Sequence, residues 1–311
     1  MKKIFLVLFL FSVHLQAQQP TAKVLPFLKN LIAEIPSVRD LTMNKKGDEI
    51  YFTVQGYQGE LSTIVHSKLI QGKWNTLAIA SFSGKYDDLE PFLSNDELRL
   101  YFASNRPTNV STDTVIDFDI WYVERKSIHD PWLNPINIGA PVNTLQDEFY
   151  PCITLSGNLY FTGGGEGTKG KDDIFMSEWT KGNFSFPVSL DTTINSVGYE
   201  FNAFIAPDES YLLFTGYNRS GGQESGDLYI SKKTATGTWG QAQPLGDEIN
   251  SKQMDYCPFV NTQTKELIFT SKRNSLGARE KEFKTLKQLF EEMNSYSNGM
   301  SRLYKTSFSI N

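Results

Sequence analysis

The stretch DLEPFLSNDELRLYFASNR, residues 88–106, decides the fold. An apolar and acidic opening leads through the polar residues 94–97 into a β-rich run that closes with Tyr101 and Phe102. This pattern predicts two antiparallel strands joined by a tight turn. Versions of the same pattern occur five times along the chain, and such recurrence predicts a repeat architecture.

The five repeats align on the phenylalanine that closes each β-rich run. A third strand follows in most units, beginning with Asp-Ile or Asp-Leu, and a recurring aromatic residue then opens a short fourth strand. Units of about 50 to 60 residues with four short strands predict an all-β fold, a single β-propeller of five four-stranded blades. The blades are expected to start near residues 38, 88, 148, 200 and 255. The closing phenylalanines are Phe52, Phe102, Phe161, Phe214 and Phe269.

The last unit shows a third strand from about residue 302 but no fourth strand before Asn311. A ring with that gap would expose a strand edge, which proteins avoid. We therefore expect the N-terminal segment, residues 24–35, to close the last blade as its fourth strand. An amphipathic helix is the alternative for this segment, but Pro26 and Pro36 disfavour a long helix.

Residues 278–293, AREKEFKTLKQLFEEM, do not fit the repeat. Phe283, Leu286, Phe290 and Met293 recur at helical spacing among charged residues, which predicts an amphipathic helix inserted into the last blade. We expect this helix to cover the rim of the propeller or one end of its channel. The same apolar stripe could instead dock a partner, which is the alternative.

The N-terminus resembles an export signal. Lys2 and Lys3 precede an apolar run over residues 4–13, and Ala17 stands at a plausible cleavage point. Residues 1–17 are predicted as a signal peptide and 18–311 as the propeller domain, so the protein is expected to be exported, either periplasmic or secreted. No later stretch reaches about 18 apolar residues, so no transmembrane segment is expected after signal removal.

Composition narrows the choice of partners. A net charge of −5 without a basic cluster argues against nucleic acid binding. Two cysteines, Cys152 and Cys257, do not imply a disulfide framework, and buried thiols are the simplest expectation for them. A monomer is expected.

The repeat D-x-x-P-x-x-S-x-D…Y-F-x-S-x-R, followed by D-[IL]-[WYF], resembles the WD-like β-propeller repeat of TolB-like proteins. The resemblance covers residues 24–311 and implies the propeller fold, but neither a particular function nor any catalytic residue. TolB itself has six blades behind a separate N-terminal domain, whereas this chain shows five units. The second unit matches best, at Asp88, Pro91, Ser94, Asp96, Tyr101, Phe102, Ser104, Arg106 and Asp119.

Carboxylates recur where the first strand of a unit starts. If the first strands line the channel, these side chains form a ring at one channel mouth that could bind a cation or a basic group. The competing interpretation is that each acid pairs with Arg106, Arg219 or Arg273 or caps backbone N–H groups, and we favour it because a position repeated in every blade serves what every blade needs. No cofactor is predicted, and a channel cation is left open. The candidate ring consists of Asp88, Glu148, Glu200 and Asp255.

No nucleophile motif is present, and the histidines are isolated. We therefore expect an exported, non-catalytic propeller that acts as a protein- or glycan-binding module of the cell envelope. The alternative is a propeller-type glycoside hydrolase, whose channel carboxylates would come from Asp87 and the four ring residues. Such an enzyme needs a carboxylate without a guanidinium partner, about 5–10 Å from another carboxylate. A structural role in an envelope assembly, docked through the inserted helix, is a third possibility.

Overall fold

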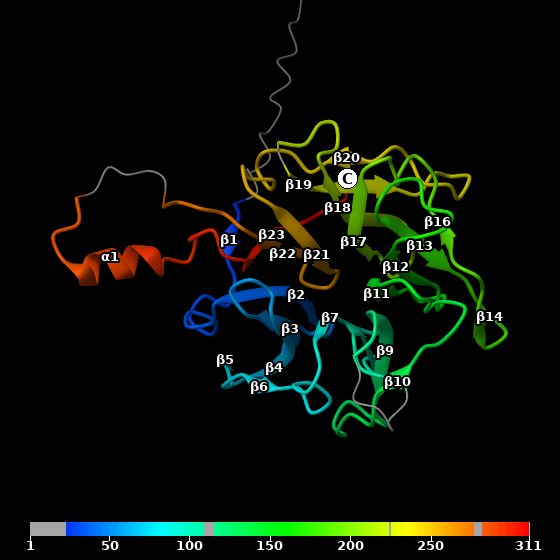
Figure 1. Cartoon of the computed structure of the whole chain (residues 1–311), viewed down its shortest axis with the longest axis horizontal. Helices are drawn as coiled ribbons and strands as arrows, with labels where there is room; N and C mark the ends of the chain where they lie inside the picture. The colour runs from blue at the N-terminus through cyan, green and yellow to red at the C-terminus, as the bar shows by residue number, and fades with distance from the viewer. Residues whose placement is uncertain (1–22, 109–114, 224, 277–281, 311) are drawn as a thin grey trace, which may run out of the picture.

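The computed structural model describes residues 23–108, 115–223, 225–276 and 282–310, and the predicted signal peptide, residues 1–17, lies outside them. The described residues form a five-bladed β-propeller of small antiparallel sheets, which confirms the predicted fold class (Figure 1). The first strand of each blade lies nearest the propeller axis, and the later strands follow outward in chain order, except that β1 is the outermost strand of the last blade.

The blades follow one another along the chain. Blade 1 contains β2 (Ser37–Met43), β3 (Glu49–Gln55), β4 (Ser62–Ile70), β5 (Lys73–Trp74) and β6 (Ala78–Ile79). Blade 2 contains β7 (Asp88–Leu93), β8 (Arg99–Ser104), β9 (Asp119–Glu124) and β10 (Ile136–Asn137). Blade 3 contains β11 (Glu148–Ile153), β12 (Leu159–Gly163), β13 (Asp173–Ser177), the hairpin β14 (Trp179–Thr180) and β15 (Asn183–Phe184), and β16 (Val188–Ser189).

Blades 4 and 5 complete the ring. Blade 4 contains β17 (Tyr199–Ile205), β18 (Tyr211–Tyr217), β19 (Gly226–Lys232) and β20 (Gln243–Pro244). Blade 5 contains β21 (Asp255–Asn261), β22 (Glu266–Ser271), β23 (Arg302–Ser307) and β1 (Leu25–Pro26).

The N-terminal strand closes the ring, as predicted. Leu25 pairs with Lys305 in an antiparallel ladder, so β1 covers the edge of β23. The strand is two residues long and does not extend over residues 24–35, because Leu28 takes a positive φ of 57° and the chain then turns. Ile32, which is fully buried, anchors the turn in the core. Burying this side chain stabilises the closure through the hydrophobic effect.

The core lies between the blades. All five closing phenylalanines are buried, with exposed fractions of 0–3%. A recurring asparagine ties the exit of the fourth strand to the third strand: Ile120 N donates to Asn143 Oδ1 and Asn143 Nδ2 donates to Ile120 O, both at 3.0 Å. Asn195 and Asn250 make the same pair of bonds in blades 3 and 4. The asparagine oxygen satisfies a third-strand N–H that the short fourth strand leaves unpaired, while the third-strand carbonyl also accepts a backbone bond, such as Ile138 N to Ile120 O at 3.1 Å.

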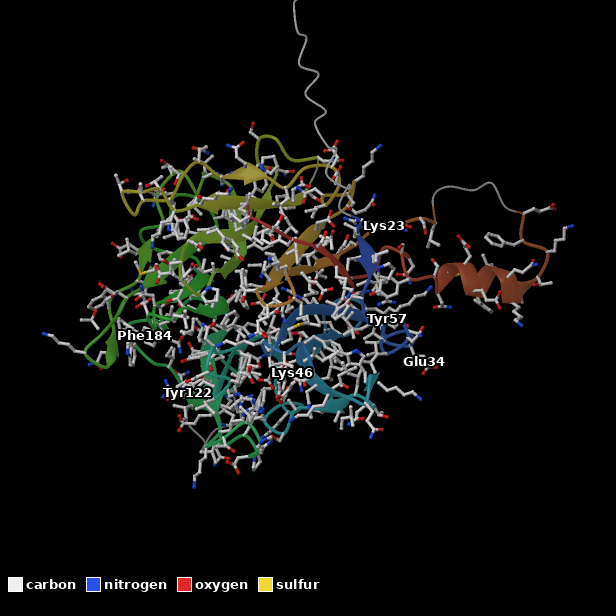
Figure 2. All side chains as sticks on the ribbon, turned by 180° about the vertical axis from the view of Figure 1, so that it is seen from behind. Lys23, Glu34, Lys46, Tyr57, Tyr122 and Phe184 are labelled. Carbon is white, nitrogen blue, oxygen red and sulfur yellow. The ribbon has the colours of Figure 1, made fainter. Side chains whose placement is uncertain are left out.

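The inserted helix does not cover the propeller, so that expectation is wrong. The helix α1 (Leu286–Met293) is shorter than the predicted 278–293, of which residues 278–281 lie outside the described part, and it stands away from the blades in both views (Figure 1, Figure 2). Its apolar side chains Leu286 and Phe290 are 71% and 54% exposed. A bond from Ser275 N to Ser297 O joins the two ends of the insertion and separates it from the sheet. No helix in the described ranges is long and apolar enough to cross a membrane.

Two phenylalanine truncations should separate the core from the inserted helix. We expect Phe269→Ala to lower the free energy of unfolding by about 3–5 kcal/mol, because it leaves a cavity between blades. The matched change Phe290→Ala, on the exposed face of α1, should alter it by less than about 0.5 kcal/mol. Urea denaturation of both variants measures the difference, and a large loss in Phe290→Ala would contradict the exposed position of the helix.

Candidate functional site

The four predicted ring carboxylates lie in the seams between blades and not on an open surface. Their exposed fractions are 0–3%. Three of them pair with the arginines named from the sequence, which we call the seam arginines. These ion pairs are Arg106–Asp88 at 2.5 Å, Arg219–Glu200 at 3.0 Å and Arg273–Asp255 at 3.3 Å.

Each seam arginine belongs to the same blade as its carboxylate and reaches back to the blade before it. Arg106 Nη2 donates to the carbonyl oxygen of Phe82 at 3.0 Å. Arg219 and Arg273 donate likewise to the carbonyls of Ile194 and Ile249. From the sequence we expect these acids to pair with arginines or to cap backbone N–H groups. The arginine makes the link to the preceding blade, through a backbone carbonyl, and the carboxylate holds the arginine in place.

Glu148 is the exception among the four. The seam arginine follows the strand partner of its carboxylate by two residues in blades 2 and 5 and by three in blade 4, and blade 3 has Gly165 and Glu166 at these positions. Glu148 accepts hydrogen bonds from Thr144 N at 3.1 Å and Thr144 Oγ1 at 2.6 Å. Burial without a cation raises the pKa of Glu148 to about 7. The seam between blades 2 and 3 thus keeps the acid but lacks the arginine that blades 2, 4 and 5 carry.

Removing a seam arginine should cost much more than neutralising Glu148. We expect Arg106→Met to lower the free energy of unfolding by about 3–5 kcal/mol, because Asp88 is left buried without its cation. Glu148→Gln keeps an acceptor for Thr144 and should cost less than about 1 kcal/mol. Chemical denaturation at pH 7 provides the comparison, and equal losses in the two variants would refute the assigned role of the seam arginines.

A bulge in every first strand turns a side chain toward the axis. The strand register shifts within β2, β7, β11, β17 and β21. The residue at each bulge has a positive φ of 50–59°, although none is glycine. Such backbone costs about 1–3 kcal/mol per residue and tends to occur at functional sites. The five bulge residues are Asp40, Glu90, Tyr150, Asn202 and Cys257.

Four of the bulge residues and Arg39 form one buried hydrogen-bonded group, which we call the axial cluster: Arg39, Asp40, Glu90, Asn202 and Cys257. Arg39 lies 2.5 Å from Asp40 Oδ1 and 2.6 Å from Glu90 Oε1. Asn202 Nδ2 donates to Glu90 Oε1 at 3.1 Å, and Cys257 Sγ donates to Asp40 Oδ1 at 2.7 Å. Asp40 Oδ2 is buried without a hydrogen-bond partner among the described residues. Glu90 of blade 2 and Asn202 of blade 4 come from blades that are not neighbours, so their contact places the cluster at the propeller axis.

Glu90 also replaces a threonine that three other seams use. Thr53, Thr162 and Thr270 each accept a hydrogen bond from the bulge N–H of the following blade, at 3.0–3.3 Å. Blade 2 has Ala103 at this position, and Tyr150 N donates instead to Glu90 Oε2 at 2.7 Å. Burial raises the pKa of Glu90 to about 7, with Arg39 opposing the rise and Asp40 adding to it.

The axial cluster borders an open cavity of about 690 Å³, which we call the funnel. Every blade contributes the residue just before its bulge to the lining. The funnel therefore opens at the end of the propeller where the first strands begin. The five contributed residues are Arg39, Leu89, Phe149, Phe201 and Tyr256.

Aromatic rings and carboxylates dominate the funnel. Tyr199 and Tyr217 are 39% and 37% exposed and meet edge to face at 5.8 Å, and Phe118 lies 5.1 Å from Phe149. Asp87, Glu90 and Asp172 add acidic groups to the lining, and burial raises the pKa of Asp172. Among the described lining residues Arg39 is the one cation, and it is bound to Asp40 and Glu90. The funnel therefore suits a ligand with apolar faces and hydrogen-bond donors or positive charge.

Sequence reasoning selected the wrong positions of the first strands for the channel lining. The in-register acids are held in the seams, whereas the lining comes from the next two residues, such as Leu89 and Glu90 after Asp88. The bulge is the cause, since it changes which side chains face the axis. Cys152 and Cys257 are free and buried, as expected. Within the described ranges no group of three or more His, Cys, Asp or Glu is placed to hold a metal ion.

Comparison with known proteins agrees with the fold. No protein-family model and no curated protein matches the chain. Similar solved structures include a putative TolB from Agrobacterium tumefaciens, which is 11% identical and has a TM-score of 0.49. The match covers 88% of this chain and 91% of that chain. A structure described as a glycoside hydrolase has 9% identity, coverage of 94% and 93%, and a TM-score of 0.57. The catalytic domain of a GH62 alpha-L-arabinofuranosidase from Coprinopsis cinerea has 9% identity, coverage of 88% and 91%, and a TM-score of 0.51.

These neighbours include both TolB proteins and glycoside hydrolases. At such low identity the likeness concerns the fold alone, because one fold carries many functions. Function has to be argued from the funnel itself.

Proposed function

We propose that the protein is a non-catalytic binding propeller that receives a segment of a protein or a glycan in the funnel. The observation that carries the proposal is the composition of the lining, in which six aromatic rings surround three carboxylates, two of which, Asp87 and Glu90, are already held by protein groups. Asp87 accepts from Ser62 N at 2.7 Å, and Glu90 is bound by Arg39, Asn202 and Tyr150 N. Fixed acceptors beside aromatic faces orient a ligand without reacting with it.

The rigidity of the axial cluster supports this role. Its side chains are anchored in several blades, so the polar floor keeps its shape whether or not a ligand is bound. A preorganised site loses less conformational entropy on binding. The binding role needs no cofactor.

Truncating an exposed funnel tyrosine should weaken binding without unfolding the protein. We expect Tyr199→Ala to reduce affinity by about tenfold or more, because exposed aromatic anchors often dominate binding energy. Phe186→Ala serves as the control, since Phe186 is 81% exposed and does not line the funnel. The measurement is titration calorimetry with ligands selected on glycan and peptide arrays, and equal affinity in the wild type and Tyr199→Ala would place the ligand elsewhere.

A glycoside hydrolase remains the second candidate because of one observation, the pKa of about 7 at Glu90. A general acid needs such a value, but it also needs freedom to reach a glycosidic oxygen. Glu90 is 4% exposed and shares Arg39 with Asp40, and Glu148, the ring acid without an arginine, does not line the funnel. The geometry therefore favours binding.

Assays with aryl glycosides distinguish the two candidates. We expect no turnover above background by the wild type and no change in Glu90→Gln. The fold of Glu90→Gln is checked by circular dichroism. Turnover that disappears in Glu90→Gln while the fold is retained would establish the hydrolase and overturn the binding role.

The proposed location is the cell envelope or the medium, on the basis of the signal-like residues 1–17. Expression of the full chain in a bacterial host should give a mature protein that begins at Gln18, because Ala17 is the predicted cleavage residue. Fractionation and N-terminal sequencing provide the test. An uncleaved protein in the cytoplasm would argue against export.

A further inference from the structure

A second cavity, of about 670 Å³, lies in the seam between blades 2 and 3, and we call it the seam groove. The turns that follow the first strands of these blades border it, through Asn95 and Gly157, so it lies at the opposite end of the propeller from the funnel. Tyr122 of blade 2 and Phe184 of blade 3 line it from either side and lie near each other in Figure 2.

The groove occupies a place that neighbouring seams fill. In the seam between blades 1 and 2, Arg125 of blade 2 lies 3.1 Å from Glu49 of blade 1, and its guanidinium stacks 4.4 Å from the ring of Trp132. Trp132 Nε1 also donates to Tyr51 of blade 1 at 2.9 Å. This seam is closed by an acid, a cation and a tryptophan.

The seam between blades 3 and 4 is closed in the same manner. Lys233 of blade 4 lies 2.9 Å from Glu209 and 5.1 Å from the ring of Trp239. Glu209 accepts a hydrogen bond from Tyr160 of blade 3 at 3.0 Å, and Trp239 meets Tyr160 edge to face at 6.5 Å. Both seams therefore contain an ion pair and pack the tryptophan against the tyrosine of the preceding blade, although the pair crosses the seam between blades 1 and 2 and lies within blade 4 in the other.

In the seam between blades 2 and 3 both sides of this arrangement are changed. Arg99 stands where blade 1 has Glu49, and Trp179 stands where blades 2 and 4 have Arg125 and Lys233. A cation and an aromatic ring thus line the same groove, Arg99 lies 5.2 Å over the ring of Tyr122 of its own blade, and no acid from blade 3 pairs with Arg99 in the described part of the chain. The ion pair of Arg99 is with Glu124 of its own blade, at 3.6 Å, and both side chains are substantially exposed.

Trp179 is held as a fixed ring at the edge of the groove. A Cβ at Gly157 would lie 3.0 Å from its indole, so the ring packs directly against this glycine. Phe184 contacts the other part of the indole edge to face at 4.7 Å, and Trp179 N is bound to Asn158 Oδ1 at 3.0 Å. Trp179 is nevertheless 39% exposed. An aromatic surface that is rigid before binding costs little entropy to use.

We infer that the seam groove binds an acidic saccharide, whose carboxylate pairs with Arg99 and whose ring stacks against Trp179. Such a ligand supplies a second acid for Arg99, whose exposed ion pair is with Glu124 of its own blade, and a surface for the aromatic rings. Lys45 adds a second positive charge to the lining, although the protein as a whole has a net charge of −5. The acid in the lining, Asp96, is already bound by Ser94 and by Leu98 N. Charge complementarity therefore favours an anion, and the volume is that of a small-molecule site.

Binding of trigalacturonate, followed by titration calorimetry and tryptophan fluorescence, tests the inference. We expect binding by the full mature chain that weakens by about tenfold or more in Trp179→Ala and in Arg99→Gln, and that falls as salt is raised. The neutral galactose trisaccharide should bind at least tenfold more weakly. Phe186→Ala and Lys126→Gln, which change an exposed aromatic residue and an exposed cation outside the groove, should bind as the wild type does.

Three outcomes would overturn the inference. Absence of trigalacturonate binding, or equal binding by Trp179→Ala and Arg99→Gln, overturns it. Selective binding of an acidic peptide in place of the saccharide also overturns it, since the ring-stacking part would then be wrong. The funnel variant Tyr199→Ala should leave trigalacturonate binding unchanged, and a loss there would assign the saccharide to the funnel.

Discussion

The structure depends on the burial of each blade by its neighbours. A blade of four short strands is too small to cover its own two faces, so its stability comes from the apolar surfaces that adjoining blades press together. The closing phenylalanines provide that surface five times. The seam arginines fix how adjoining blades are oriented. Each is held by a carboxylate of its own blade and donates to a carbonyl of the blade before it. Closure by β1 then leaves no gap in the ring.

The bulges convert this scaffold into a site. Without the bulges, equivalent positions of the five first strands would have the same surroundings in every blade. A positive φ at one residue of each first strand brings Asp40, Glu90, Asn202 and Cys257 into contact across the axis. The polar floor of the funnel is thus built from contacts between residues that lie 55 to 217 residues apart in the chain. Backbone strain of this kind persists where the surrounding structure holds it in place.

Asymmetry among the seams gives the propeller its distinguishing chemistry. The seam between blades 2 and 3 has Ala103 where the other blades have a threonine, Gly165 where blades 2 and 5 have an arginine, and Trp179 where blades 2 and 4 have a cation. Glu90 compensates for the first change by accepting the bond from Tyr150 N. The second leaves Glu148 without a guanidinium, and the third opens the seam groove. A repeat protein can acquire a specific surface where one unit departs from what all units require.

The sequence by itself determined the architecture, because strand periodicity and the recurring phenylalanines are local signals that survive in every unit. The pairing of Asp88 with Arg106, and the closure by the N-terminal segment, also followed from the repeat. Only the tertiary structure decided which residues face the axis, since a bulge shifts the alternation of side chains and has no clear signature in a strand such as residues 88–93. It also decided that α1 stands apart from the blades, because an apolar stripe at helical spacing does not specify what it packs against.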